Sequence, residues 1–158
     1  MNSPNDAQNN TLPTKRLERA IKFACGEFSL VIACCNSISN QEQIINLLRE
    51  SLSTDIQEII LSPETETLYS NIVNKLGTSQ PPVLMIRGLE SVNDINQLLI
   101  STNMMRDGFR KYFHCPIVLW VNDEILTKLV WLAPDFKNWA ASTIRFEASL
   151  MQEAVLSA

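Results

Sequence analysis

The chain has 158 residues, of which 46% are hydrophobic and 19% charged, and its formal net charge is −4. This balance is typical of one globular domain that is long enough to bury a core. A mild acidic excess without basic clusters argues against nucleic acid or an anionic membrane as the partner. With four glycines and one histidine, glycine-rich loops and catalysis by imidazole groups are not expected.

The apolar runs and the N-terminal residues indicate in which cellular compartment we expect the protein. No apolar run approaches the roughly 18–20 residues that cross a bilayer. The first ten residues have neither the basic nor the apolar stretch of a secretory signal. With four cysteines and no such signal, we expect a cytoplasmic protein with reduced thiols and no membrane contact.

The first third of the chain predicts a helix, a buried strand and a second helix. Residues 1–13 are polar and are expected to form a disordered lead-in. An apolar stripe predicts a helix from Thr14 to Gly26. Residues 28–35 are nearly all apolar, which is typical of a strand covered on both faces. Ser39 and Glu42 match a capping box and predict the start of the next helix.

The alternation of helix and strand continues to residue 147. Further strands are expected at 56–61, 83–86, 117–121 and 143–146, and helices at 68–76, 95–113 and 125–132. Residues 14–147 therefore predict a single α/β domain, a three-layer αβα sandwich with a five-stranded, mainly parallel sheet. The tail, residues 148–158, has room for one or two further helical turns.

A family resemblance lies in residues 83–92, VLMIRGLESV. They resemble the Walker B segment of NACHT-type STAND NTPases, four apolar residues followed by Asp-Gly-Leu-Asp-Glu. Gly88 and Leu89 match, Glu90 takes the second acidic position and Ser91 the third, but Arg87 replaces the Asp that helps to hold magnesium. The resemblance implies a sheet of the P-loop NTPase type over residues 14–147.

Two further resemblances extend this one. Residues 119–123, LWVND, resemble the sensor strand of the same family, which implies that Asn122 or Asp123 faces a γ-phosphate. Residues 28–36, 82–92 and 133–139 resemble N-terminal domains of large cyanobacterial proteins, which often continue into tetratricopeptide or related repeats. STAND proteins place a lid and a sensor repeat after this core. The resemblance therefore implies either a part of a longer protein or a stand-alone remnant.

The segment that would bind phosphate lacks the residues for it. A P-loop needs Gly-x-x-x-x-Gly-Lys-[Ser/Thr], so that backbone N–H groups and a lysine surround the phosphates. Residues 33–41 contain no Gly, Lys or Arg. We therefore expect no ATP hydrolysis, no ATP binding and no cofactor. Arg87 is expected to pair with Glu90, Asp94 or Asp123. The remnant positions of a nucleotide site would be Ser37, Ser39, Arg87, Glu90, Asn122 and Asp123.

The thiols offer a redox or metal hypothesis. Cys34 and Cys35 are expected to be small hydrophobic residues that end a buried strand. A cluster of Cys25, Cys115 and His114 stays open on geometry, because all three lie at the opposite sheet edge. It lacks paired C-x-x-C spacing, so no metal site is predicted.

Charged side chains near the predicted helices have ordinary explanations. Asp123 and Glu124 are expected to complement the N-terminus of a helix rather than to act as a catalytic pair. Arg106, Arg110 and Lys111 are expected to form a solvated helix face, with a role toward a neighbouring subunit as the alternative.

The expected function is a non-catalytic protein-interaction or signalling module, derived from a P-loop NTPase, that binds a protein partner or itself. Aromatic residues at a loop are favoured anchors for partners, and the interaction candidates are Trp131, Asp135, Phe136 and Trp139. The alternative is a nucleotide-binding STAND-type switch with a non-standard site or with activity only in an oligomer. A third hypothesis is a small enzyme that uses Cys34, Cys35 or Asp123.

Overall fold

The computed structural model describes residues 4–24 and 26–147. Each strand in it follows at least one helix, as the sequence predicts. The elements in chain order are α1 (Pro4–Phe23), β1 (Ser29–Cys35), α2 (Ile38–Ser51), β2 (Ile56–Ile60), α3 (Leu68–Leu76), β3 (Val83–Arg87), the 3-10 turn η1 (Leu89–Ser91), α4 (Ile95–Met104), α5 (Arg106–Tyr112), β4 (Pro116–Val121), α6 (Asp123–Leu132), α7 (Pro134–Lys137) and β5 (Thr143–Phe146).

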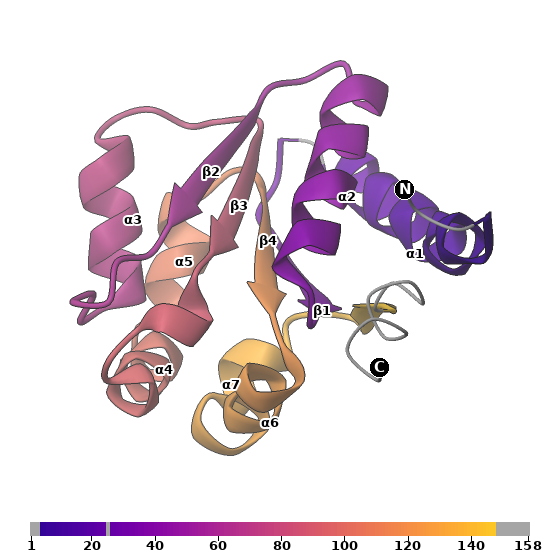
Figure 1. The fold of residues 1–158 in the computed structure, drawn as a ribbon. Coiled ribbons are helices and arrows are strands. Elements are labelled where there is room, and N and C mark those ends of the chain that lie inside the picture. The colour runs from indigo at the N-terminus through magenta and orange to yellow at the C-terminus, as the bar shows by residue number, and fades with distance from the viewer. Residues whose placement is uncertain (1–3, 25, 148–158) are drawn as a thin grey trace.

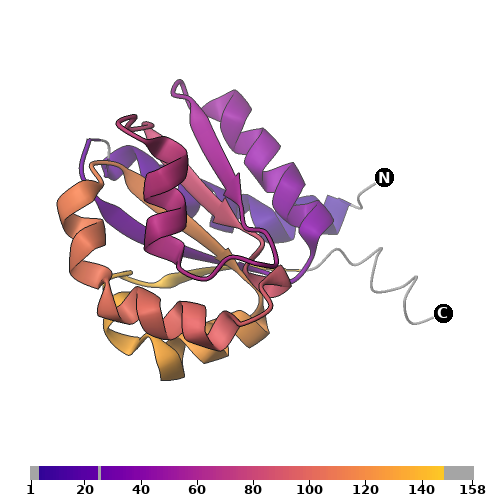
Figure 2. The ribbon, with the colours of Figure 1, turned by 90° about the vertical axis from the view of Figure 1, so that its left-hand side faces the viewer.

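The five strands form one parallel sheet in the order β2-β3-β4-β1-β5. The carboxyl ends of the strands therefore meet at one edge, toward which the arrows in Figure 1 point. Helices α1 and α2 cover one face of the sheet, and α3 to α7 cover the other (Figures 1 and 2). The predicted three-layer α/β sandwich with a five-stranded parallel sheet is confirmed.

The central strands are buried on both faces, which explains their continuous apolar runs. Side chains alternate across a pleated strand, so successive residues of β1 enter two separate hydrophobic clusters. Ile32 and Cys34 face α3 to α7 in one cluster. Ala33 and Cys35 face α1 and α2 in the other.

Helix α1 begins at Pro4, so the predicted disordered lead-in is wrong for residues 4–13. Proline is favourable in the first turn of a helix. The Thr14 hydroxyl donates a hydrogen bond to the Asn10 carbonyl beside Pro13. The Asn10 side chain also bonds to the backbone of Glu147, beyond β5, a long-range contact that the local pattern does not reveal. Residues 1–3 and the predicted helical tail, 148–158, lie outside the described residues.

The long helix predicted over residues 95–113 is two helices, α4 and α5, which break at Met105. The break lets Phe109 and Phe113 contact the ring of Tyr69 on α3. Gly108 permits this approach, because a Cβ added there would lie 3.0 Å from that ring. Within residues 4–24 and 26–147, no helix combines the length and apolarity needed to cross a membrane.

Candidate functional site

The carboxyl edge of the sheet is the place where open α/β sheets bind ligands. The strand order brings the ends of β3, β4 and β1 side by side, with Ile86 level with Leu119 and Cys34 level with Val121. In a sheet of the P-loop NTPase type these three ends would carry the Walker B residue, the sensor residue and the phosphate loop. The chemistry of this edge therefore decides whether a nucleotide fits.

The connection from β1 to α2 contains only Asn36 and Ser37. A phosphate loop has four residues between its two glycines alone, so it does not fit into this connection. Ser37 is the N-cap of α2, and its hydroxyl accepts a hydrogen bond from the Asn40 backbone N–H at 3.2 Å. The predicted capping box at Ser39 and Glu42 is therefore wrong, and the helix begins two residues earlier.

A closed network joins β1, α6 and β5 above this turn. The Asn36 side-chain amide donates to the Asp123 carboxylate at 2.8 Å, and its carbonyl accepts from the Asp123 backbone N–H at 2.9 Å. Arg145 on β5 pairs with the same carboxylate at 3.0 Å. These partners lower the pKa of Asp123, with the largest effect from Asn36, followed by Cys34 and Arg145. Asp123 therefore stays ionised and presents negative charge where the resemblance implies a γ-phosphate.

Asn122 does not face a ligand site. Its side-chain oxygen accepts from the Ile125 backbone N–H at 2.8 Å and caps α6. Asp123 and Glu124 occupy the first turn of that helix, where negative charge complements the helix dipole. The predicted role of this acidic pair as a charge complement is confirmed.

Arg87 ends β3 on the face that packs under α2, because it alternates with Val83 and Met85. Only 9% of its surface is exposed. Its guanidinium donates to the Gln41 side-chain oxygen at 2.7 Å and pairs with Glu58 at 2.9 Å and with Glu42 at 3.5 Å. The guanidinium of Arg87 is therefore already paired with hydrogen-bond acceptors from its own chain.

The partners predicted for Arg87 were Glu90, Asp94 or Asp123, and this prediction is wrong. Those residues lie beyond the sheet edge, whereas the pleat directs Arg87 toward α2. Glu90 is exposed in η1, and Asp94 caps α4 by accepting from the Gln97 backbone N–H.

Glu58 is the anionic centre of the cluster around Arg87. It also pairs with Arg49 of α2 at 2.6 Å. Burial alone would raise the pKa of Glu58, but hydrogen bonds from Arg49 and Arg87 outweigh burial, so the pKa lies below its usual value of 4.5. An ionised Glu58 paired with two arginines joins β2, β3 and α2 at the place where the resemblance implies a Walker B residue.

A pocket of about 540 Å³ also lies at this edge, between the loops that follow β2 and β3. Its ionisable lining residues are Glu64, Glu66 and Asp94, and none of its lining residues is basic. Three carboxylates repel a polyphosphate. The pocket is therefore poorly suited to ATP.

The buried thiols are poor nucleophiles. Burial raises the pKa of Cys34 to about 11, and the hydrogen bond to Asp123 adds to this effect. Burial also raises the pKa of Cys35, and that of Cys115 to about 11. At neutral pH these side chains are thiols, so the geometry does not support the thiol-enzyme hypothesis.

Metal ligands are not gathered in the described part of the chain. Among residues 4–24 and 26–147, no group of three or more His, Cys, Asp or Glu side chains is placed to hold an ion. Cys25 lies outside the described residues, so the open hypothesis of a cluster with Cys115 and His114 falls partly outside them.

The four predicted interaction residues occupy different environments. Trp131 on α6 is 78% exposed, and Asp135 is exposed with Arg106 3.9 Å away. Phe136 is buried against Phe109, which corrects its prediction as an interaction residue.

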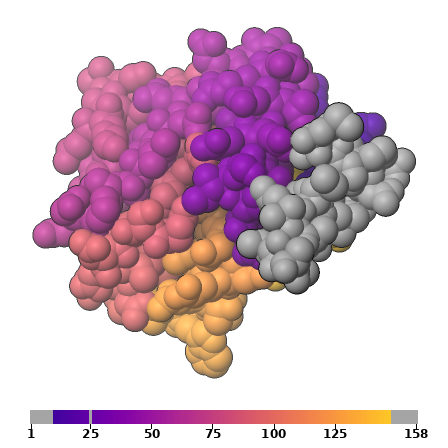
Figure 3. Space-filling view, viewed as in Figure 1, coloured from indigo at the N-terminus to yellow at the C-terminus, as the bar shows by residue number. Residues whose placement is uncertain are grey.

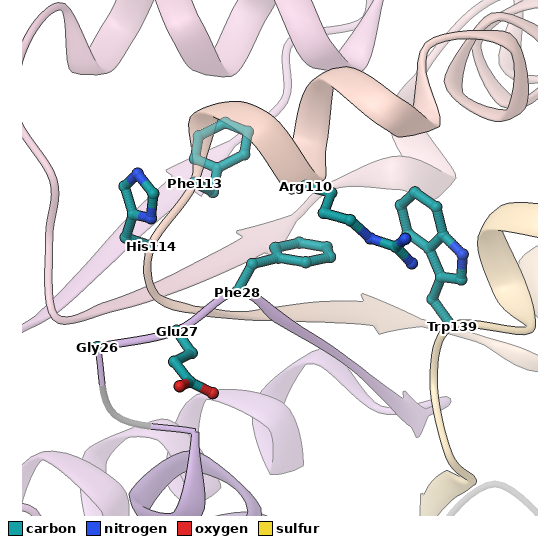
Figure 4. Close-up of a pocket in the computed structure, with 7 residues that line it drawn as sticks. All are labelled: Gly26, Glu27, Phe28, Arg110, Phe113, His114 and Trp139. Carbon is teal, nitrogen blue, oxygen red and sulfur yellow. The ribbon is translucent and has the colours of Figure 1, made fainter.

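Trp139 is half-buried and belongs to a pocket of about 420 Å³ at the amino edge of the sheet, opposite the carboxyl edge (Figure 4). The Arg110 guanidinium lies 4.4 Å from the centre of its ring. In Figure 4 the side chain of Glu27 points away from this pair, and His114 stands apart from it. Arg110 therefore has a packing role in addition to the predicted solvated one.

Sequence reasoning missed Asn36, Arg145, Gln41 and Glu58. Each acts through a partner that is distant in the chain, such as Asn36 with Asp123. The register of the strands could have indicated these partners, because the parallel pairing of β1 with β4 and β5 places Cys34 beside both Val121 and Arg145. That register becomes known only with the strand order.

Fold and site together define an α/β protein with a five-stranded parallel sheet in the order β2-β3-β4-β1-β5. No family model matches the sequence, and neither does any curated protein. Among solved structures, the Aeropyrum pernix Orc1 protein in complex with DNA is similar at 12% identity and a TM-score of 0.49. The alignment covers 94% of this chain and 48% of that one, so this chain spans about half its length.

Proposed function

We propose that this chain is a non-catalytic protein-interaction or signalling module derived from a P-loop NTPase of the NACHT/STAND kind. The observation that carries the proposal is the two-residue connection between β1 and α2. It leaves no loop to surround a phosphate, and Ser37 already caps the helix that would bind one. The resemblance to N-terminal domains of cyanobacterial repeat proteins supports a role beside other domains.

The charges of the site support the same proposal. Arg87 takes the position of a magnesium-binding Asp, and Glu58 neutralises it from within the fold. Asp123 is paired with Arg145 at the position that would face a γ-phosphate. A nucleotide would have to break both ion pairs without a lysine or a metal ion to replace them.

The first test is equilibrium dialysis of the full chain with labelled ATP and ADP, with and without magnesium. We expect no saturable binding up to about 1 mM nucleotide, which corresponds to a binding free energy weaker than about −4 kcal/mol. An active P-loop ATPase in a parallel chamber is the positive control. Micromolar, magnesium-dependent binding would overturn the proposal and favour the nucleotide-binding switch. Repeating the dialysis at high protein concentration tests for nucleotide binding that requires an oligomer.

The surface that we assign to interaction lies on α4 and α6, which are side by side in Figure 3. A hydrogen bond from Lys128 to Asn96 joins α6 to α4, and a hydrogen bond from Asn103 to Asp135 joins α4 to α7. The side chains of Ile100, Met104 and Trp131 are exposed along these helices, Met104 at 74%. Exposed apolar patches of this kind mark contact sites, and two copies pair such patches symmetrically.

Trp131→Asp is expected to weaken self-association, because a carboxylate in place of an indole cannot be buried against a second copy without cost. Sedimentation velocity over a range of protein concentrations measures the effect, which we expect to be about tenfold or more in the dimer dissociation constant. The matched control is Phe23→Asp on α1, an exposed aromatic residue away from α4 and α6. Equal association of wild type and Trp131→Asp would exclude this surface.

A further inference from the structure

Strand β2 forms one outer edge of the sheet, and its even-numbered residues direct their backbone groups away from the protein. Alternate residues of a parallel strand bond to the same neighbour. The Leu61 backbone N–H donates to the Arg87 carbonyl at 2.9 Å, so the odd-numbered residues bond to β3. The N–H and C=O groups of Glu58 and Ile60 therefore point outward. In the described part of the chain these four groups have no hydrogen-bond partner.

The chain's own donors close this edge on both sides of the outward groups. The Ile56 carbonyl accepts a hydrogen bond from the Arg49 side chain at 2.9 Å. The Ser62 carbonyl accepts one from the Thr65 backbone N–H at 3.1 Å. The free groups that remain between these carbonyls lie symmetrically on either side of Ile59. A stretch with this symmetry is complementary to a copy of itself across a two-fold axis.

Strand β2 lacks the features with which proteins usually block an edge, namely lysine, proline, a bulge or a covering element. It contains neither Lys nor Pro and pairs residue for residue with β3, so it has no bulge. Figure 2 shows β2 between α2 and α3, with neither helix in front of it, and Ile60 is 60% exposed. The opposite edge differs. Strand β5 has only four residues, and Asn10 of α1 bonds to both backbone groups of Glu147 directly beyond it.

We propose that β2 pairs antiparallel with β2 of a second copy, about a two-fold axis at Ile59. In this register Glu58 of one copy exchanges both backbone hydrogen bonds with Ile60 of the other. All the outward groups of one copy then bond to those of the other, which favours a second copy over an unrelated strand.

The side chains at this junction are compatible with the pairing. Ile60 of one copy lies opposite Glu58 of the other, and the charge of Glu58 is already neutralised by Arg49 and Arg87. Each copy therefore covers the exposed isoleucine of the other without bringing an unpaired charge beside it. This inference goes beyond the proposed function, because it uses a surface separate from α4 and α6.

Amide hydrogen exchange of the full chain, measured by NMR over a dilution series, tests the proposal. The Glu58 and Ile60 amides point to solvent in a single copy and become protected when the strands pair. We expect their exchange to slow roughly tenfold or more as the protein concentration rises to about 1 mM. A mixture of isotope-labelled and unlabelled chains should also give a nuclear Overhauser signal between the Hα atoms of Ile59 in the two copies, since facing residues of this kind lie close together.

Variants of Ile60 separate backbone pairing from other contacts. Ile60→Pro removes an outward N–H and spares the bonds to β3, because proline is tolerated on an edge strand where the N–H faces solvent. We expect it to abolish both the protection of Glu58 and the Ile59 signal. Ile60→Val keeps the N–H and is the matched control, which should behave as the wild type. Ile60→Asp leaves the backbone unchanged but places like charges opposite each other, so it should also weaken the pairing. Trp131→Asp on α6 should leave both signals unchanged.

Three results would overturn the proposal. One is exchange of the Glu58 and Ile60 amides that does not change with the concentration of the wild type. Another is protection without the Ile59 signal, since a different contact would then cover this edge. The third is concentration-dependent protection of Glu58 that persists in Ile60→Pro while circular dichroism shows this variant to be folded.

Discussion

Arg87→Asp, which introduces the acidic residue that a Walker B strand has at this position, is expected to destabilise the protein by roughly 3 to 5 kcal/mol. The change removes the cation that Glu58 and Gln41 contact and places a third carboxylate beside Glu58 and Glu42. A buried charge without its partner retains its desolvation cost without compensation. Urea denaturation followed by circular dichroism measures the loss, which we expect to appear as a lower midpoint with an unchanged slope.

Two further variants separate the buried pair from general damage to β3. Arg87→Met leaves Glu58 with Arg49 alone and is expected to destabilise the fold, whereas Arg87→Met combined with Glu58→Leu should recover part of that loss. An Arg87→Asp protein that keeps wild-type stability and gains magnesium-dependent ATP binding would contradict the structural role of this arginine.

Gly88→Ala is expected to cost about 2 to 3 kcal/mol, because the position combines backbone strain with a close contact. Gly88 has a φ of +89°, and a Cβ added there would lie 3.0 Å from both the backbone nitrogen and the backbone oxygen of Leu61. Thermal and urea unfolding measure the effect. The glycine that matches the Walker B motif is therefore required by the turn between β3 and η1, with or without a nucleotide.

Gly26→Ala is the matched control for this contact. Gly26 also has a positive φ, +82°, but a Cβ added there meets no atom within 4 Å. We expect this variant to lose only the cost of a positive φ, about 1 kcal/mol. Equal losses at Gly26 and Gly88 would show that the approach to Leu61 is not the cause.

The fold was predictable because its signals are local. The continuous apolar runs of β1 and β4 identify strands that are covered on both faces, and Gly77 ends α3 as the pattern predicts. The start of α1 was not predictable, because the turns before Thr14 are polar and the Asn10 side chain bonds to a strand end 137 residues away. The break at Met105 depends in the same way on packing against Tyr69.

Of the candidate site, too, only the local features were predictable from the sequence. The absence of Gly, Lys and Arg from residues 33–41 is visible in the sequence, but the length of the turn depends on where the helix begins, and Ser37 and Ser39 are both good caps. The partners of Arg87 depend on which face of the sheet it occupies and on the neighbouring position of β2. No spacing rule brings Glu58 to Arg87 before the strand order is known.

The brevity of the turn after β1 also limits what evolution or engineering can do with this chain. Building a triphosphate cradle here would take an insertion as well as substitutions, and the insertion would displace Asn36 from Asp123 and Ser37 from the start of α2. Each intermediate on that route would lose these contacts before it gained a phosphate ligand. Single changes at this turn are therefore expected to lower stability without adding a nucleotide site.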